Sequence, residues 1–184
     1  MIKKVIVIFI FILFINPAQS DEDTMILKLK TGNVIIELFG ETAPNHVKRF
    51  KQLANEKKYD GVVFHRVIDG FMAQTGDVEF GNSNLATYDI RRFGTGGSEY
   101  PDLKAEFSNI PHERGTLSMA RSSDPNSANS QFFICFKASP SLDRQYTIFG
   151  KVVQGMEFVD LIKRGEGSNG EVSDPDQIIS LSAK

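Results

Sequence analysis

The sequence predicts a mainly β fold, an eight-stranded antiparallel β-barrel capped by two α-helices. Three observations favour this class: about eight short strand-like segments, two segments with helical periodicity, and no regular alternation of strand and helix. The 184 residues suit one domain with a full core. The 15 Phe and the absence of Trp predict that Phe, Ile and Val build this core. We expect the domain to span residues 21–184.

The first 20 residues are expected to lie outside the fold, as a signal peptide. Two lysines precede an apolar run over residues 5–15, and Ala18 and Ser20 place small residues where a signal peptidase reads the chain. This run of 11 residues is shorter than the roughly 20 residues that a membrane-spanning helix needs. We therefore expect a periplasmic protein without stable membrane association after cleavage. The alternatives are that the protein is secreted, or that an uncleaved signal segment tethers it.

The domain begins with a predicted hairpin and helix. Alternation of apolar and polar side chains predicts strands over residues 25–30 and 34–39, joined by a turn. Thr42 suits a helix cap, Pro44 suits the first helical turn, and apolar residues recur at helical spacing over residues 44–57.

The remaining elements follow the same signals of periodicity and turn residues. Residues 78–102, rich in Gly, Asn, Ser and Tyr without periodicity, are predicted to be loop. Further strands are predicted over residues 62–68, 71–74, 116–120, 131–136, 147–153 and 177–181, with a short second helix within residues 156–162.

Three segments carry the functional signal: residues 64–77, 115–121 and 130–134, followed by Leu142 and Tyr146. The first contains the long pattern F-H-R-x-I-x-G-F-M-x-Q-x-G-D. In this order the segments resemble the cyclophilin family of peptidyl-prolyl cis/trans isomerases, and the resemblance runs from about Met25 to the last strand. It implies a monomeric enzyme without cofactor or metal that acts on proline-containing polypeptides and unfolded exported proteins.

The chemistry of the Xaa-Pro bond explains why such residues occur together. Twisting the bond destroys amide resonance, which creates a barrier of about 18–20 kcal/mol. A fixed guanidinium that binds the twisted amide better than either planar isomer lowers this barrier without a covalent intermediate. The resemblance assigns that role to Arg66. Without its neighbours, an Arg on a strand would more often form a surface ion pair.

The resemblance also implies a peptide-binding groove. An apolar pocket accepts the proline ring, Gln74 orients the arginine, and the backbone at positions 120 and 121 meets the residue beside proline. Outside the resemblance, the apolar members would be ordinary core residues. The implied substrate-binding residues are Phe71, Met72, Gln74, Ala120, Arg121, Gln131, Phe133, Leu142 and Tyr146.

Three features depart from the pattern of many relatives. Ser141 stands where many carry the tryptophan that is associated with tight cyclosporin binding, so we expect weak inhibition by that drug. Tyr146 replaces a pocket histidine of many eukaryotic members. Residues 78–93 form a longer insertion than the smallest members possess.

Other function classes lack their signals. A formal net charge of −2 without a basic run gives no reason to expect a nucleic-acid partner. His46, His65 and His112 have no metal-ligand spacing, and a core or hydrogen-bonding role is expected for His65. Residues 94–98 are rich in glycine but lack a phosphate-loop ending, and no G-x-S-x-G elbow is present. Cys135 is expected to be a buried structural thiol.

Two alternatives to the enzyme stay open on sequence grounds. The groove could hold peptides without turnover, although binding alone would not require Arg66. The insertion over residues 78–93 could dock one dedicated secreted client.

Overall fold

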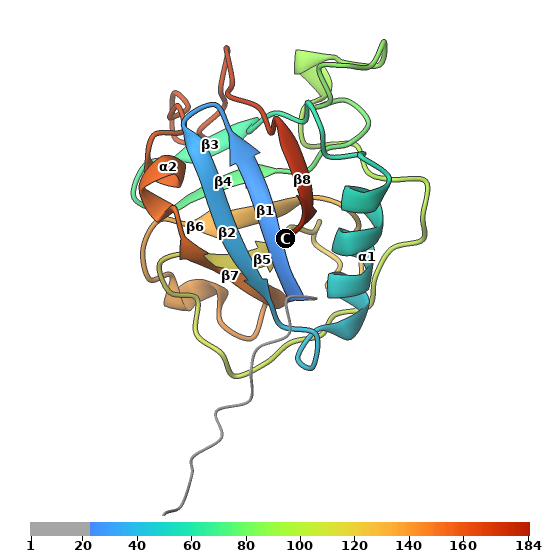
Figure 1. Ribbon diagram of the computed structural model, residues 1–184, viewed down its shortest axis with the longest axis vertical. Coiled ribbons are helices and arrows are strands. Elements are labelled where there is room, and N and C mark those ends of the chain that lie inside the picture. Colours follow the sequence, from blue (N-terminus) through green and yellow to red (C-terminus); the bar gives the residue numbers. More distant parts are fainter. Residues whose placement is uncertain (1–22) are drawn as a thin grey trace, which may run out of the picture.

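The computed structural model describes residues 23–184, and its eight strands lie within a few residues of the predicted ones (Figure 1). The predicted signal peptide lies outside the described residues. The predicted strands over residues 62–68 and 177–181 differ most, because the regular strands begin only at residues 66 and 180. The strands are β1 (Thr24–Leu29), β2 (Gly32–Leu38), β3 (Arg66–Ile68), β4 (Met72–Thr75), β5 (Thr116–Met119), β6 (Phe132–Cys135), β7 (Ile148–Gln154) and β8 (Ser180–Ala183).

Two α-helices lie at opposite sides of the sheet, α1 (Pro44–Asn55) and α2 (Met156–Asp160) (Figure 1). Helix α1 carries Pro44 in its first turn as predicted, but its cap residue is Ala43 rather than Thr42, and no side chain caps it. The helix ends before Lys57, whose positive φ of 56° is incompatible with helix continuation. Among residues 23–184, no helix is long and apolar enough to cross a membrane.

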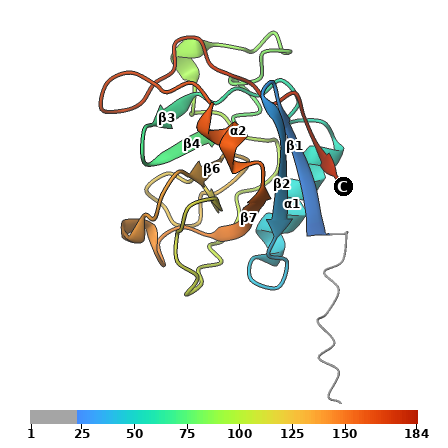
Figure 2. The same ribbon diagram turned by 60° about the vertical axis from the view of Figure 1, so that its left-hand side comes forward.

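Two long loops meet at one end of the molecule. The predicted loop over residues 78–102 contains one short 3₁₀ turn, η2 (Ile90–Arg92). Figure 2 shows it at the same end as the loop that joins α2 to β8. A second 3₁₀ turn, η3 (Pro140–Leu142), lies between β6 and β7.

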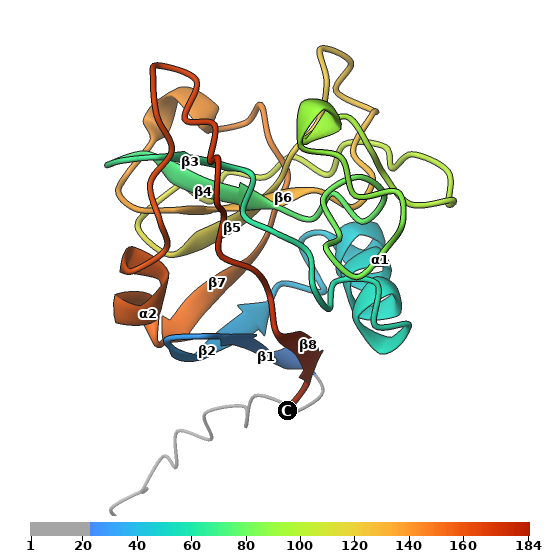
Figure 3. The ribbon, with the colours of Figure 1, turned by 90° about the horizontal axis from the view of Figure 1, so that it is seen from above.

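All eight strands belong to one antiparallel sheet with the order β3-β4-β6-β5-β7-β2-β1-β8. The sheet curls, so that β1 and β2 lie across the interior from β3 and β4 (Figure 3). Regular pairing stops at β3 and β8. The predicted mainly β class, with eight antiparallel strands and two helices, is confirmed, and the predicted barrel takes the form of a half-barrel.

Irregular backbone pairing spans the opening between β3 and β8. The amide of Phe64 donates to the carbonyl of Asp176 at 2.8 Å, and the amide of Ile178 donates to the carbonyl of Val62 at 2.8 Å. These bonds satisfy backbone groups that a regular strand would have paired with a neighbour. They explain why β3 and β8 are shorter than predicted.

Aromatic rings fill the core between the sheet and α1. The ring of Phe50 lies 5.2 Å from that of Phe132 on β6 and 5.0 Å from that of Phe149 on β7. Tyr59 packs edge-on against Phe132 and donates its hydroxyl to the carbonyl of Ser130 at 2.9 Å. Burial of each such ring contributes roughly 1.5–3 kcal/mol. Phe, Ile and Val make up much of the core as predicted, but leucine, which the prediction left out, occurs there more often than Phe or Ile.

Candidate functional site

Strands β3, β4 and β6 present two opposite faces, because side chains alternate along a strand. One face, with Val67, Ala73 and Ile134, belongs to the main core. The register pairs Arg66 with Gln74 and Gln74 with Phe133. These three residues therefore share the other face, away from the main core.

A chain of side-chain hydrogen bonds runs across this face. Arg66 Nη1 donates to Gln74 Oε1 at 3.3 Å, and Gln74 Nε2 donates to Gln131 Oε1 at 3.0 Å. Gln131 Nε2 then donates to the carbonyl of Gly96 at 2.8 Å. From the other side, Arg66 Nε donates to the carbonyl of Asn169 at 2.9 Å. The guanidinium is thereby held by two independent contacts.

The guanidinium of Arg66 keeps donors available for a ligand. Within residues 23–184, no carboxylate forms an ion pair with it, and its Nη2 group has no hydrogen-bond acceptor. Arg66 is half-buried, and this desolvation lowers its pKa from the ordinary value, partly offset by Tyr146. Arginine still remains cationic at neutral pH. The site therefore offers a positive charge that no carboxylate neutralises, on a partly desolvated side chain.

An apolar cluster separate from the main core lies beside Arg66. Arg66 Nη1 lies 4.0 Å from the sulfur of Met72, which belongs to this cluster. Phe133 and Tyr146 meet edge to face, with ring centroids 5.8 Å apart. The cluster consists of Met72, Phe133, Cys135 and Leu142, with Ile68, Phe71, Ala120 and Tyr146 packed against it. Every apolar residue that the resemblance assigns to the groove is thus in one place.

The two remaining predicted residues, Ala120 and Arg121, border this cluster. The amide of Ala120 donates to the carbonyl of Gln131 at 2.9 Å. The guanidinium of Arg121 lies 4.5 Å from the ring centroid of Tyr146, and its Nη2 donates to the carbonyl of Gln145 at 3.0 Å. Arg121 thereby fixes Tyr146 at the edge of the cluster. The structure brings all ten predicted site residues together, and their roles remain predictions.

Two cavities meet at Gln74 and Gly94. The larger, of about 700 Å³, extends from Arg66 to residues 90–94 and 166–173. The smaller, of about 470 Å³, is lined by Ala120, Arg121, Gln131 and the glycine-rich residues 94–98. The glycine-rich segment therefore flanks the predicted groove.

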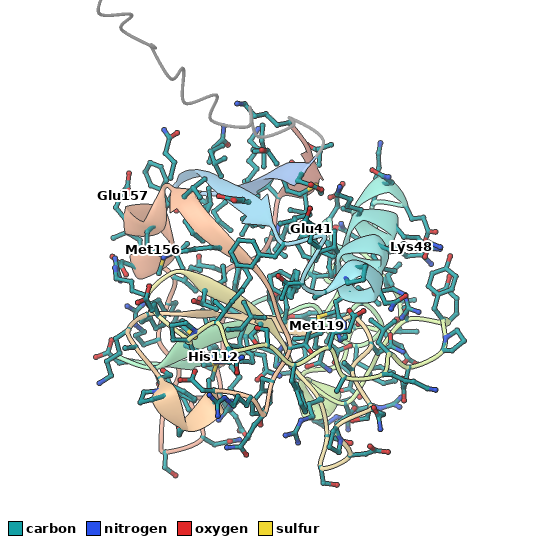
Figure 4. All side chains as sticks on the ribbon, turned by 90° about the horizontal axis from the view of Figure 1, so that it is seen from below. Glu41, Lys48, His112, Met119, Met156 and Glu157 are labelled. Carbon is teal, nitrogen blue, oxygen red and sulfur yellow. The ribbon has the colours of Figure 1, made fainter. Side chains whose placement is uncertain are left out.

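Sequence reasoning missed a buried network behind Phe133. The ring of His112, which is labelled in Figure 4, stacks against that of Phe133 at 6.3 Å, and its Nδ1 lies 2.9 Å from Asp143 Oδ1. Its Nε2 lies 3.0 Å from the hydroxyl of Ser118, which donates to the carbonyl of Thr147. The buried hydroxyl of Ser118 is not placed as a nucleophile. Because 31 residues separate His112 from Asp143, no local spacing could reveal this contact.

His65 and Cys135 are both buried, as predicted. His65 is 4% exposed, and within the described residues neither ring nitrogen has a hydrogen-bond partner, so it fills a core position without the hydrogen bond considered for it. Burial lowers the pKa of His65 to about 4, which leaves it neutral at pH 7. Cys135 is fully buried, and burial raises the pKa of its thiol to about 12. It belongs to the apolar cluster rather than to the main core.

Comparisons with known proteins agree with this geometry. Residues 24–183 match the family model described as cyclophilin type peptidyl-prolyl cis-trans isomerase/CLD. A probable peptidyl-prolyl cis-trans isomerase of Brucella suis biovar 1 is 60% identical over 163 residues, which cover 88% of this chain and 83% of that protein. A peptidyl-prolyl cis-trans isomerase of Helicobacter pylori strain J99 is 40% identical over 144 residues, 76% of this chain and 80% of the relative.

Solved structures show the same fold. A cyclophilin type peptidyl-prolyl cis-trans isomerase from Cryptosporidium parvum, crystallised in the presence of the dipeptide Ala-Pro, is similar with a TM-score of 0.75 and 28% identity. The match covers 88% of this chain and 98% of that one. A cyclophilin from Hirschia baltica is similar with a TM-score of 0.73 and 26% identity, covering 89% of this chain and 74% of the other.

Proposed function

The chain belongs to the family of cyclophilin-type peptidyl-prolyl cis-trans isomerases, and from this we propose that Arg66 accelerates rotation about Xaa-Pro bonds by stabilising the twisted amide. The observation that carries the proposal is the cationic Arg66, held by Gln74 and Asn169 and unpaired with any carboxylate of residues 23–184. As the amide twists, its nitrogen regains a lone pair. A fixed donor then binds the transition state more strongly than the planar ground state.

The apolar cluster supports a place for the proline ring. Phe71 and Tyr146 are only partly buried, so the cluster is open to solvent on the face that carries Arg66. A proline ring resting there would place its amide beside the guanidinium, because Met72 contacts both. Stabilisation of the twisted amide by the neighbouring guanidinium requires no proton transfer. The mechanism is electrostatic and needs no covalent intermediate.

The test is cis-to-trans exchange of a short Xaa-Pro-Phe peptide, measured with residues 21–184 and with the Arg66→Ala variant. We expect strong acceleration that falls by at least about 100-fold in the variant, since a hydrogen bond from a charged donor contributes about 1.5–3 kcal/mol and the charge itself adds to this. Circular dichroism must show that the variant stays folded. If the natural protein bound the peptide without accelerating the exchange, the result would contradict the proposed enzyme and favour a peptide-binding module.

We further propose that the protein assists folding of exported polypeptides as a periplasmic monomer. The support is the signal-like pattern of residues 1–20. Uncatalysed prolyl isomerisation takes tens to hundreds of seconds, long enough to leave exported chains prone to aggregation. Cell fractionation, with N-terminal sequencing of the mature protein, tests this. Recovery of an uncleaved protein from the cytoplasm would contradict it.

A further inference from the structure

The larger cavity beside Arg66 has two walls of different chemistry. One wall comes from the insertion and contains Ile90 and Phe93. The other comes from the loop between α2 and β8 and contains Glu166 and Glu171. Ile90 is 50% exposed, so an apolar side chain already faces solvent at this position. An apolar wall opposite a carboxylate wall suits a long side chain with a charged end.

The insertion wall is held in place by a buried carboxylate. Asp77 is fully buried, and its Oδ2 accepts hydrogen bonds from the amides of Gly94 at 2.8 Å and Gly96 at 3.1 Å. Its Oδ1 accepts from the amide of Phe80 at 2.9 Å. Both ends of the insertion are therefore tied to one side chain. The cavity is preorganised, which lowers the entropic cost of binding.

The opposite wall carries two carboxylates without a cationic partner. Glu166 and Glu171 pair across an antiparallel bridge, which directs their side chains to the same side. Neither forms an ion pair within residues 23–184. Of the two arginines that line the cavity, Arg91 is bound by both carboxylate oxygens of Asp89. Arg66 pairs with Glu171 across a second isolated bridge but forms no ion pair with it, and its guanidinium is held by Gln74 and the carbonyl of Asn169. This wall therefore carries two carboxylates on one side, which attract a cationic group.

The floor of the cavity adds an unsatisfied polar group. His65 lines the cavity, is 4% exposed, and has no hydrogen-bond partner for either ring nitrogen in the described part of the chain. A buried polar group without a partner costs about 1–3 kcal/mol. Both ring nitrogens are shielded from the surface, so the neutral imidazole forms the floor of the cavity rather than an acceptor for a ligand. The carboxylates of the opposite wall are the acceptors that the cavity presents to a cationic group.

We propose that this cavity binds the side chain of a lysine or arginine that lies within three residues of the isomerised proline. The proposal rests on the proposed function, because it assigns a substrate preference to the same site. The methylene stem packs against Ile90 and Phe93, and the cationic head donates to Glu166 and Glu171. Within residues 23–184, no three His, Cys, Asp or Glu side chains converge as metal ligands, so the geometry favours an organic cation.

The test is a peptide series with one Xaa-Pro bond, in which each position within three residues of proline carries lysine, norleucine or glutamate in turn. Values of kcat/KM and Kd are measured at low and high salt for the natural protein and for the double variant Glu166→Gln/Glu171→Gln. The matched control is Glu41→Gln/Glu157→Gln, which removes the same charge from residues that line neither cavity (Figure 4).

We expect one position to prefer lysine over norleucine by about three- to tenfold at low salt, as two exposed ion pairs allow, with less preference at high salt. The preference, taken as the ratio of kcat/KM for the lysine and norleucine peptides so that any change in basal turnover cancels, should disappear in the cavity variant and persist in the control. No lysine preference at any position, or one that the cavity variant retains, overturns the proposal. If the natural protein turned over none of the peptides, the proposed function would be refuted. The Kd values would still test whether the cavity binds lysine.

Discussion

Replacing Gln74 by leucine tests whether the hydrogen-bond chain positions Arg66. The change removes the 3.3 Å bond from Arg66 Nη1 and the 3.0 Å bond to Gln131, and keeps side-chain size similar. Arg66 keeps its bond to the carbonyl of Asn169, so only one of its two anchors is lost. A bond from a charged donor contributes about 1.5–3 kcal/mol, and its 3.3 Å length places it at the weak end. We therefore expect about a tenfold loss in kcat/KM.

The assay is cis-to-trans exchange of an Xaa-Pro-Phe peptide. The loss should appear mainly in kcat, because misplacing the guanidinium weakens the transition state more than the bound ground state. Gln131→Leu should cost less in kcat, since Gln131 reaches Arg66 only through Gln74, and loss of its predicted contact with the peptide should appear in KM. The matched control is Gln52→Leu on α1, whose amide bonds Glu56 outside the site. Its activity should be unchanged.

A double-mutant cycle separates positioning from a general structural effect. In an Arg66→Ala background, Gln74→Leu should cost almost nothing further, because no guanidinium remains to be positioned. A full tenfold loss in that background would refute the reasoning. An unchanged kcat/KM for Gln74→Leu alone, with the arginine present and the protein folded, would also refute it.

Two further predictions concern pH and inhibition. Because burial lowers the pKa of His65 to about 4, the unfolded chain binds a proton below pH 6.5 that the folded chain does not, so stability should fall by up to about 3 kcal/mol between pH 6.5 and 4. Urea denaturation should show a flatter pH dependence for His65→Phe, and parallel curves would contradict this. The natural protein should bind cyclosporin weakly, and Ser141→Trp should lower the Kd by about tenfold or more, since burial of an aromatic side chain contributes about 1.5–3 kcal/mol. Equal affinities measured by calorimetry would disprove it.

The members of the candidate site were predicted from the resemblance to the cyclophilin family, and local backbone geometry accounts for part of their placement. Alternation along a strand requires Met72 and Gln74 to share a face, whatever the rest of the fold does. The helical spacing of Val47, Phe50 and Leu53 likewise predicted the buried face of α1, which the structure confirms. These features depend on backbone geometry within a few residues. They are therefore readable from a single chain.

The lengths of β3 and β8 could not be predicted from the local sequence. Residues 62–64 read as strand because they are apolar, yet their backbone bonds are divided among several segments: the amide of Phe64 donates to Asp176, whereas those of Val62 and Val63 donate to Tyr59 and Gly81. Burial alone does not reveal which segment a strand pairs with. The half-barrel is the result of that pairing.

The sequence by itself determined the mainly β class, the Phe-rich core, the family resemblance and the set of residues near Arg66. Only the tertiary structure decided that His112 stacks against Phe133, and that Ile90 and Glu166 line the same cavity. The physical reason is range. Periodicity reports the local geometry of the backbone, whereas contacts between distant segments depend on how the whole sheet curls and which loops it brings to one end.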